Sequence, residues 1–263
     1  MAEDRYLLDN RAPAAGARFE ALSAIFDPST FSHLEGLGIS EGWCCWEVGA
    51  GGVSVVEWMA RRVGVDGRVL ATDIDVSWAE QAAGPNVEVR RHDVARDASP
   101  EGLFDLVHAR LVLVHVIDRD IALRSMVQVL RPGGWLLVED ADPALQPLSA
   151  LDPQGPADEL ANKLRTGFRA LLKERGVDLS YGRKLPRLLR DAGLVDVSAD
   201  AYFPVAMPVC AELETATIMM VGDDLISHGV TTAEELDRHL ANVAAGTVDL
   251  AQPPMISAWG RRA

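Results

Sequence analysis

The sequence predicts an α/β protein built around a doubly wound, mostly parallel, seven-stranded sheet. Two observations predict this fold class. Between residues 44 and 140, short apolar runs alternate with helix-like patterns, as in parallel strands joined by crossover helices. After residue 194, two further segments show the apolar alternation of strands, which brings the expected number of strands to seven.

The first five strands and their connections follow in chain order. The run CCWEV ends in the glycine-rich turn GAGGVS, and a helix with apolar residues at helical spacing follows it up to Val63. Gly64 ends this helix, and RVLATD is the second strand. A helix capped by Asp118 and reaching Leu130 is expected before the fifth strand. The expected strands are 44–48, 68–73, 86–91, 104–109 and 135–139.

The second half of the chain is expected to complete the sheet and to cover it. Thr231 and Glu234 have the spacing of a capping box, and His228 with Gly229 is typical of a helix C-terminus. The late helices would fold over the sheet as a lid. The N-terminal 40 residues predict one or two helices that pack on the same side. The expected late helices are 157–175, 183–192, 211–228 and 232–245, and the expected late strands are 195–203 and 254–261.

Composition excludes several classes of protein. A formal charge of −14 would repel a nucleic-acid backbone, so we expect no nucleic-acid partner. No stretch of about eighteen apolar residues predicts a membrane span, and the acidic start MAEDRYLLDN lacks a secretory signal. We therefore expect a cytoplasmic protein that does not enter a membrane. Cys44 and Cys45 are adjacent and would face opposite sides of a strand, so buried thiols are expected and no metal site.

Residues at three strand ends indicate a nucleoside pocket. The turn EVGAGG lets the backbone approach a ligand at a helix N-terminus, although a purely structural tight turn is the alternative. A nicotinamide fingerprint would need glycine at Ser54, which disfavours a dehydrogenase. Asp73 could accept two hydrogen bonds from a ribose diol, with Asp75 as a rival and a capping role as the alternative. Asp93 could accept from an adenine amine while the backbone of Val94 donates, or it could serve only as a turn aspartate.

Together these motifs resemble the class I S-adenosylmethionine-dependent methyltransferases, in particular the UbiE-like or methyltransferase-domain group that acts on small molecules. The resemblance spans residues 43–140, and the two ends of the chain match only loosely. It implies a Rossmann-like sheet with a helical lid. The motifs that carry it, in chain order, are CCWEVGAGG, ATDID, RRHDV, FDLVHARLVLVHV and LRPGGWLLVED.

The resemblance also implies a cofactor and its contacts. S-adenosyl-L-methionine would bind and S-adenosyl-L-homocysteine would be the product. Residues 1–142 would hold N-terminal helices and the cofactor-binding core, and residues 143–263 the rest of the sheet with the lid, within one structural domain. Tyr6 and Arg18 could close over the cofactor. The implied cofactor contacts are Glu47, Gly49, Ala50 and Gly51 at the methionine and ribose, Asp73 and Ile74 at the ribose and adenine, Asp93 and Val94 at the adenine edge, and Arg110 at the methionine end.

The expected reaction is methyl transfer to oxygen, nitrogen or carbon of a small molecule by a monomer or homodimer, and secondary metabolism is the expected setting. His115 is the candidate base because its ordinary pKa is close to neutrality, with a structural histidine as the alternative. Glu139, Asp140 and Asp142 are interpreted as solvated loop acids, with an amine or ion site as the alternative. Val53 and Val114 depart from the family pattern, which keeps open a second function, a protein of this fold that does not transfer methyl groups, such as a cyclase or a ligand-binding protein.

The late helices contain an apolar stripe that also has two interpretations. It could line an apolar substrate chamber, or it could be ordinary core packing at helical spacing. The stripe consists of Leu213, Met219, Met220 and Leu225.

Overall fold

The seven strands form one mixed sheet in the order β3-β2-β1-β4-β5-β7-β6 in a computed structural model that describes residues 7–263. The first five strands are parallel, and β7 runs antiparallel to both β5 and β6. The strands are β1 (Cys44–Val48), β2 (Arg68–Asp73), β3 (Val87–Arg91), β4 (Phe104–Arg110), β5 (Leu130–Ala141), β6 (Leu194–Tyr202) and β7 (Met255–Arg262). This is the Rossmann-like α/β class that the sequence predicts.

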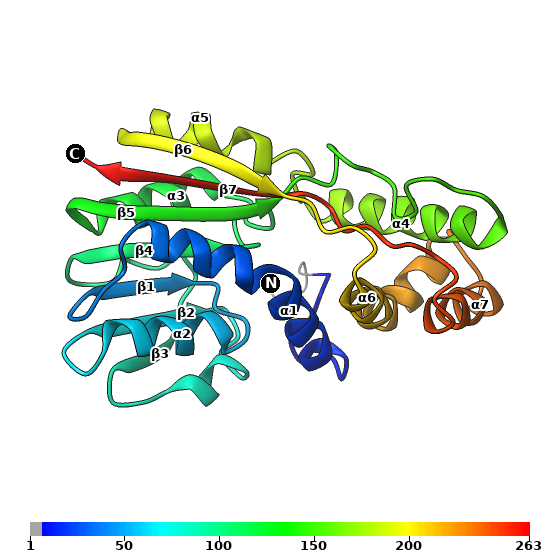
Figure 1. Ribbon diagram of the computed structural model, residues 1–263, viewed down its shortest axis with the longest axis horizontal. Helices are drawn as coiled ribbons and strands as arrows, with labels where there is room; N and C mark the ends of the chain where they lie inside the picture. The colour runs from blue at the N-terminus through cyan, green and yellow to red at the C-terminus, as the bar shows by residue number, and fades with distance from the viewer. Residues whose placement is uncertain (1–6) are drawn as a thin grey trace.

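Helices pack on both faces of this sheet (Figure 1). The second half of α1 and all of α2 cover one face, where Leu34 and Met59 pack on strand residues such as Leu106. Helices α3 and α5 cover the other face, where Met126 and Leu189 belong to the larger apolar cluster. These helices are α1 (Ala15–Gly36), α2 (Ser54–Val63), α3 (Arg119–Gln128) and α5 (Leu185–Asp191).

Three further helices form a lobe beyond the carboxyl ends of the parallel strands (Figure 1). They are α4 (Pro156–Glu174), α6 (Pro208–Ser227) and α7 (Ala233–Ala244), and short 3₁₀ turns occur at η2 (Ala79–Ala82) and η3 (Gly182–Lys184). The first half of α1 packs against α6, where Ile25 and Phe26 share an apolar cluster with Leu213. The predicted packing of the N-terminal helix on the late helices is therefore confirmed. Among residues 7–263, we find no helix that combines the length and the apolar character of a membrane span.

Two local expectations are wrong by a few residues. Helix α3 ends at Gln128, and Leu130 instead begins β5, because it pairs with Phe104 across a register shift. The capping box of α7 is formed by Thr232 and Glu235 rather than by Thr231 and Glu234. Thr232 has the extended backbone that an N-cap needs, and its Oγ1 accepts from the Glu235 N–H. By contrast, the C-terminus of α6 is as predicted: His228 is the C-cap that follows Ser227, and Gly229 comes next with a φ of 68°.

Candidate functional site

Parallel pairing brings the predicted site residues to one edge of the sheet. Val48 at the end of β1 pairs with Thr72 of β2 and with Ala109 of β4. Asp73 at the end of β2 pairs with Arg91 of β3. The glycine turn, Asp73, Asp93 and Arg110 therefore all leave the sheet at its carboxyl edge, beside the helical lobe (Figure 1).

The glycine turn after β1 leaves no room for a side chain at Gly49 or Gly51. Gly49 and Gly51 have φ values of 66° and 57°, which favour glycine. A Cβ at Gly49 would lie 2.3 Å from Val112 Cγ2, and one at Gly51 would lie 2.8 Å from Phe19 Cε1. The Ala50 N–H donates to the Thr72 carbonyl across 3.0 Å, which holds the turn against β2. Such a turn at the start of a helix fits a ligand that approaches the backbone closely.

Asp73 is the acidic residue that faces this turn. Its Oδ2 accepts from the Gly51 N–H at 3.0 Å, and its Oδ1 accepts from the Asp75 N–H at 3.0 Å. Burial raises the pKa of Asp73, and these N–H donors act in the opposite direction. The rival Asp75 instead directs its Oδ1 to the N–H and hydroxyl of Ser77. A carboxylate beside a glycine-rich turn is suited to bind a ribose diol, so the residues present fit the adenosine part of the implied cofactor.

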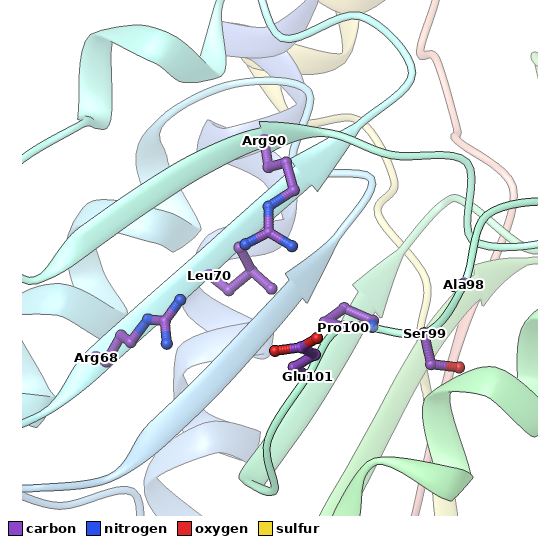
Figure 2. Close-up of a pocket in the computed structure, with 7 residues that line it drawn as sticks. All are labelled: Arg68, Leu70, Arg90, Ala98, Ser99, Pro100 and Glu101. Atoms are coloured by element: carbon purple, nitrogen blue, oxygen red, sulfur yellow. The ribbon is translucent and has the colours of Figure 1, made fainter.

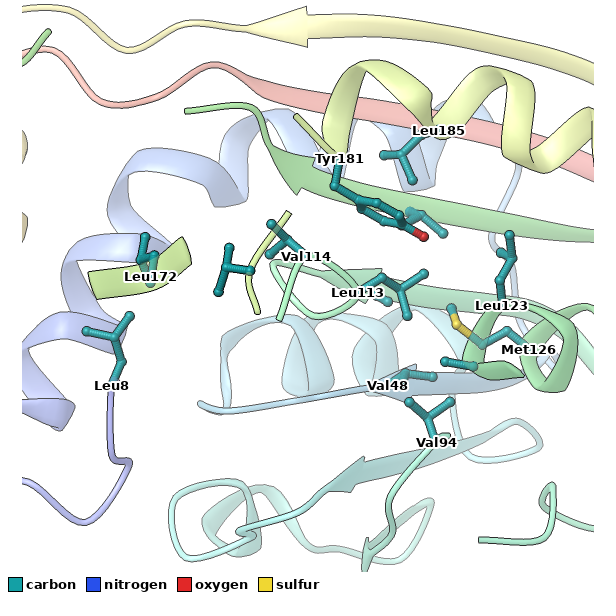
Figure 3. Packing of buried hydrophobic residues seen from close by; sticks show 14 of the residues in the cluster. Leu8, Val48, Val94, Leu113, Val114, Leu123, Met126, Leu172, Tyr181 and Leu185 are labelled. Atoms are coloured by element: carbon teal, nitrogen blue, oxygen red, sulfur yellow. The ribbon is translucent and has the colours of Figure 1, made fainter. Parts of the chain in front are cut away.

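Asp93 and Val94 have local structural contacts in addition to their predicted role. Asp93 Oδ1 accepts from the Ala95 N–H at 3.0 Å, which is the turn-aspartate geometry left open by the sequence. The Val94 side chain packs into the apolar core near Val48 (Figure 3). The Ile74 carbonyl accepts from Arg91 Nε at 3.0 Å. The adenine contacts of these residues stay predictions.

Glu47 lies within a buried chain of charged groups. Its Oε2 accepts from His108 Nδ1 at 2.6 Å, and His108 Nε2 lies 3.2 Å from Glu139 Oε2. Glu47 and His108 are register neighbours on β1 and β4. Burial disfavours a charge on His108, but the two carboxylates outweigh it and raise the pKa of His108 to about 9. His108 therefore carries a positive charge at neutral pH.

The series of charged groups continues from His108 through Glu139 to the protein surface. Glu139 Oε1 lies 3.1 Å from His33 Nδ1 and accepts from the Ser257 hydroxyl at 2.7 Å, while Thr30 donates to Oε2 at 2.5 Å. His33 Nε2 lies 3.0 Å from Asp200 Oδ2. The hydrogen bond to Glu139 is the main cause that raises the pKa of His33 to about 9. We call the series Glu47, His108, Glu139, His33 and Asp200 the carboxylate–imidazole ladder.

The interpretation of Glu139, Asp140 and Asp142 as solvated loop acids is wrong. All three are 0% exposed, because β5 extends to Ala141 and pairs with β7 as far as Met255. Asp142 pairs with Arg183, whose Nε donates to Oδ2 at 2.6 Å. Burial raises the pKa of Asp140 well above its usual range.

Arg110 is the last residue of β4, and His115 follows in the loop after it. Arg110 NH1 lies 2.9 Å from Asp27 Oδ1 and donates to Thr30 Oγ1 at 2.9 Å, so it joins β4 to α1. Burial lowers the pKa of His115 to about 3, and the charges of Arg18 and Arg119 act in the same direction. His115 is therefore a neutral, weakly basic imidazole. Tyr6, suggested as a closing residue, lies outside the described residues.

Sequence reasoning missed the aromatic contacts that close the glycine turn. Phe19 of α1 lies against Gly51, and its ring meets that of Trp78 edge-on with centroids 6.1 Å apart. Trp78 also packs against Gly16 of α1 and donates from Nε1 to the Asn10 carbonyl at 2.8 Å. Trp78 follows soon after Asp73 in the chain, and that nearness of an aromatic residue to a ribose-type acid is the signal that could have found it.

Other features of the chain lie apart from this edge or serve packing. Figure 2 shows a surface cavity between β2, β3 and the loop 98–101, where Arg68 and Arg90 both pair with Glu88 and no predicted site residue is present. In the lobe, Leu213 and Leu225 are buried in different clusters and Met219 is 66% exposed, which favours core packing for the apolar stripe. Among residues 7–263, no group of three His, Cys, Asp or Glu side chains is arranged to hold a metal ion.

Comparisons with known proteins agree with this fold. Residues 46–138 match the family model of the methyltransferase domain. The chain is 33% identical over 141 residues to methyltransferase str2 of Strobilurus tenacellus, covering 53% of this chain and 48% of that protein. It is 26% identical over 178 residues to phosphoethanolamine N-methyltransferase 1 of Arabidopsis thaliana, covering 65% of this chain and 33% of that protein. The chain thus spans about a third to a half of the length of these relatives.

A solved structure extends the likeness over the whole chain. Phosphoethanolamine N-methyltransferase 2 of Haemonchus contortus, in complex with S-adenosyl-L-methionine, has a TM-score of 0.59 at 15% identity and covers 100% of this chain and 60% of that one. Residues 46–138 thus carry a methyltransferase domain, and the chain as a whole shares the fold of that solved structure. Both findings support the resemblance to the class I S-adenosylmethionine-dependent methyltransferases.

Proposed function

We propose that this protein transfers a methyl group from S-adenosyl-L-methionine to a small-molecule acceptor and releases S-adenosyl-L-homocysteine. The observation that carries this proposal is the 3.0 Å hydrogen bond between the Gly51 N–H and the Asp73 carboxylate at the carboxyl edge of the sheet. It sets the acid proposed to bind ribose directly beside Gly51, where the turn leaves no room for a side chain.

The proposed cofactor site follows the edge from β4 to β3. Glu47 and Arg110 would hold the methionine end, and Gly49, Ala50 and Gly51 would line its passage to the ribose. Asp73 would bind the ribose hydroxyls. Ile74 would pack on the adenine, and Asp93 with the Val94 N–H would recognise its edge.

When bound, S-adenosyl-L-methionine supplies an activated methyl group, so the protein mainly aligns the acceptor with it. The neutral His115 can accept a hydrogen bond from an acceptor hydroxyl or amine. With a pKa of about 3, His115 is better suited to orient the lone pair of the acceptor than to hold a proton. We propose His115 on this basis as a residue that orients the acceptor, and the role of base that the sequence suggests stays a prediction.

The acceptor is proposed to be a small molecule rather than a nucleic acid, in keeping with the charge of −14. The relatives include enzymes named for nitrogen and for carbon methylation, such as the ubiquinone/menaquinone C-methyltransferase UbiE of Escherichia coli, 32% identical over 121 residues. Oxygen, nitrogen and carbon therefore all stay candidate atoms. A cytoplasmic location, a monomer or homodimer, a role in secondary metabolism and the division of labour at residue 142 also stay predictions.

Calorimetric titration with S-adenosyl-L-homocysteine tests the cofactor site. Asp73→Ala should weaken binding about tenfold or more, the usual consequence of losing hydrogen bonds to a charged group. Asp75→Ala is the matched control, because Asp75 bonds to Ser77 instead of facing the glycine turn, and its affinity should stay within about twofold. Equal affinities of the two variants would contradict the assignment of Asp73.

Transfer of label from methyl-labelled cofactor to a panel of amines, phenols and acidic carbons tests turnover. Label in an acceptor supports the proposal. The [4+2]-cyclase SpnF shares the fold, with a TM-score of 0.52 at 16% identity over 90% of this chain. Tight cofactor binding without transfer to any acceptor would favour that second, non-methylating class of function.

A further inference from the structure

We infer that His108 is a positioning residue for cofactor recognition: it orients the Glu47 carboxyl group so that the site selects the amino-acid end of the cofactor. The inference rests on the proposed function, because it concerns how the same site grips S-adenosyl-L-methionine. It goes further by assigning a role to a buried histidine that none of the motifs singles out.

The first step is the charge of His108. Each of its nitrogens faces a carboxylate oxygen, Nδ1 at 2.6 Å from Glu47 and Nε2 at 3.2 Å from Glu139. A neutral imidazole has one N–H and can donate to only one acceptor, whereas an imidazolium can donate to both. His108 is 0% exposed, so water does not replace either partner. An imidazolium satisfies both carboxylates at once, in keeping with the raised pKa of His108.

The second step is the orientation of Glu47. The His108 bond takes its Oε2, and among the described residues no hydrogen bond reaches its Oε1. Glu47 is 2% exposed and stands one residue before the end of β1, ahead of the glycine turn. A buried carboxylate with one satisfied oxygen and one open oxygen beside a ligand turn is suited to accept from an ammonium group.

The third step is what fixes the ring. Glu139 is held by Thr30 of α1 and Ser257 of β7 as well as by His33. Two secondary-structure elements, α1 and β7, thus fix the acid that fixes His108. The ring is oriented from the side away from the cofactor, and its Nδ1 side is presented to Glu47.

Two isosteric variants separate the two sides of the ring. In His108→Asn the amide nitrogen can take the place of Nδ1 and still donate to Glu47. In His108→Gln it can take the place of Nε2 and donate only to Glu139. Both variants remove the imidazolium charge and both are polar, so they form a matched pair.

The measurement is calorimetric affinity for two ligands, S-adenosyl-L-homocysteine and 5′-methylthioadenosine, which lacks the amino-acid end. His108→Gln should weaken binding of S-adenosyl-L-homocysteine about tenfold and leave 5′-methylthioadenosine within about twofold. His108→Asn should retain most of the preference for S-adenosyl-L-homocysteine. Glu47→Gln should lose that preference as His108→Gln does.

Three outcomes would overturn the inference. The first is an equal loss of affinity for both ligands in His108→Gln, and the second is no loss of affinity for either ligand. The third is a His108→Asn variant that binds S-adenosyl-L-homocysteine as weakly as His108→Gln does. Binding of 5′-methylthioadenosine reports whether each variant is folded, since that ligand needs Asp73 and the glycine turn but not Glu47. If the unmodified protein binds neither ligand, the proposed function itself fails, and this result is distinct from the other three.

Discussion

The two faces of the central sheet bury side chains of opposite character in the same strands. On the α3 and α5 face, Trp46, Val107 and Val138 enter a continuous apolar core (Figure 3). On the α1 and α2 face, the next residue of each strand is Glu47, His108 or Glu139, and these form the carboxylate–imidazole ladder. One face is held by apolar packing, whereas part of the other depends on charge pairs that must all be present together.

Removing the central acid of the ladder should have the largest effect. Glu139→Gln leaves two imidazolium groups with weakened partners, and breaking a buried ion pair costs about 3–5 kcal/mol of unfolding free energy. Leu136 is a fully buried residue of β5 whose side chain lies on the face opposite the ladder. Leu136→Ala should cost about 2–4 kcal/mol of unfolding free energy. Urea unfolding at neutral pH measures both. A loss of unfolding free energy below about 1 kcal/mol for Glu139→Gln would show that the ladder does not stabilise this face of the sheet.

The pH dependence of stability should separate the two faces next. The pKa values of His33 and His108 are raised to about 9 in the folded protein, above their ordinary value of 6.5. Their contribution to stability is therefore complete below pH 6.5 and is lost as the pH rises through about 9. Urea unfolding across this range should show a steeper fall for the unmodified protein than for His33→Gln. Leu136→Ala should lower the curve without changing its slope, and equal slopes for His33→Gln and the unmodified protein would refute the assignment.

A smaller effect is expected where α1 meets the glycine turn on the ladder face. Gly51→Ala places a side chain at a φ of 57° and directs it at Phe19. The backbone strain alone costs about 1–2 kcal/mol. Gly246→Ala has a φ of 63° and open space around it, so it supplies a similar backbone strain without the contact. Thermal unfolding should show a larger loss for Gly51→Ala, and a loss no larger than that of Gly246→Ala would mean that α1 yields to the added methyl group.

The same contrast explains what the sequence could predict. Apolar runs and glycines located the strands, the turn after β1 and Asp73, because these signals are local. The ladder joins Glu47 to His108 across 61 residues and Glu139 to His33 across 106, so no local pattern reveals it. Glu139 looked solvated because the antiparallel β7, which extends β5 and buries its end, lies far along the chain. The capping box moved by one residue because Thr231 and Thr232 are chemically identical and only backbone conformation separates them.

The place of β6 in the sheet has a consequence for the order of assembly. Within the sheet β6 is paired with β7, yet the whole of α6 and α7 separates the two strands along the chain. During synthesis β6 must therefore wait, with its hydrogen-bonding edge exposed, until β7 emerges and enters between it and β5. Asp200 of β6 can meet His33 only after that step, so the last rung of the ladder closes late, through contacts of high sequence separation.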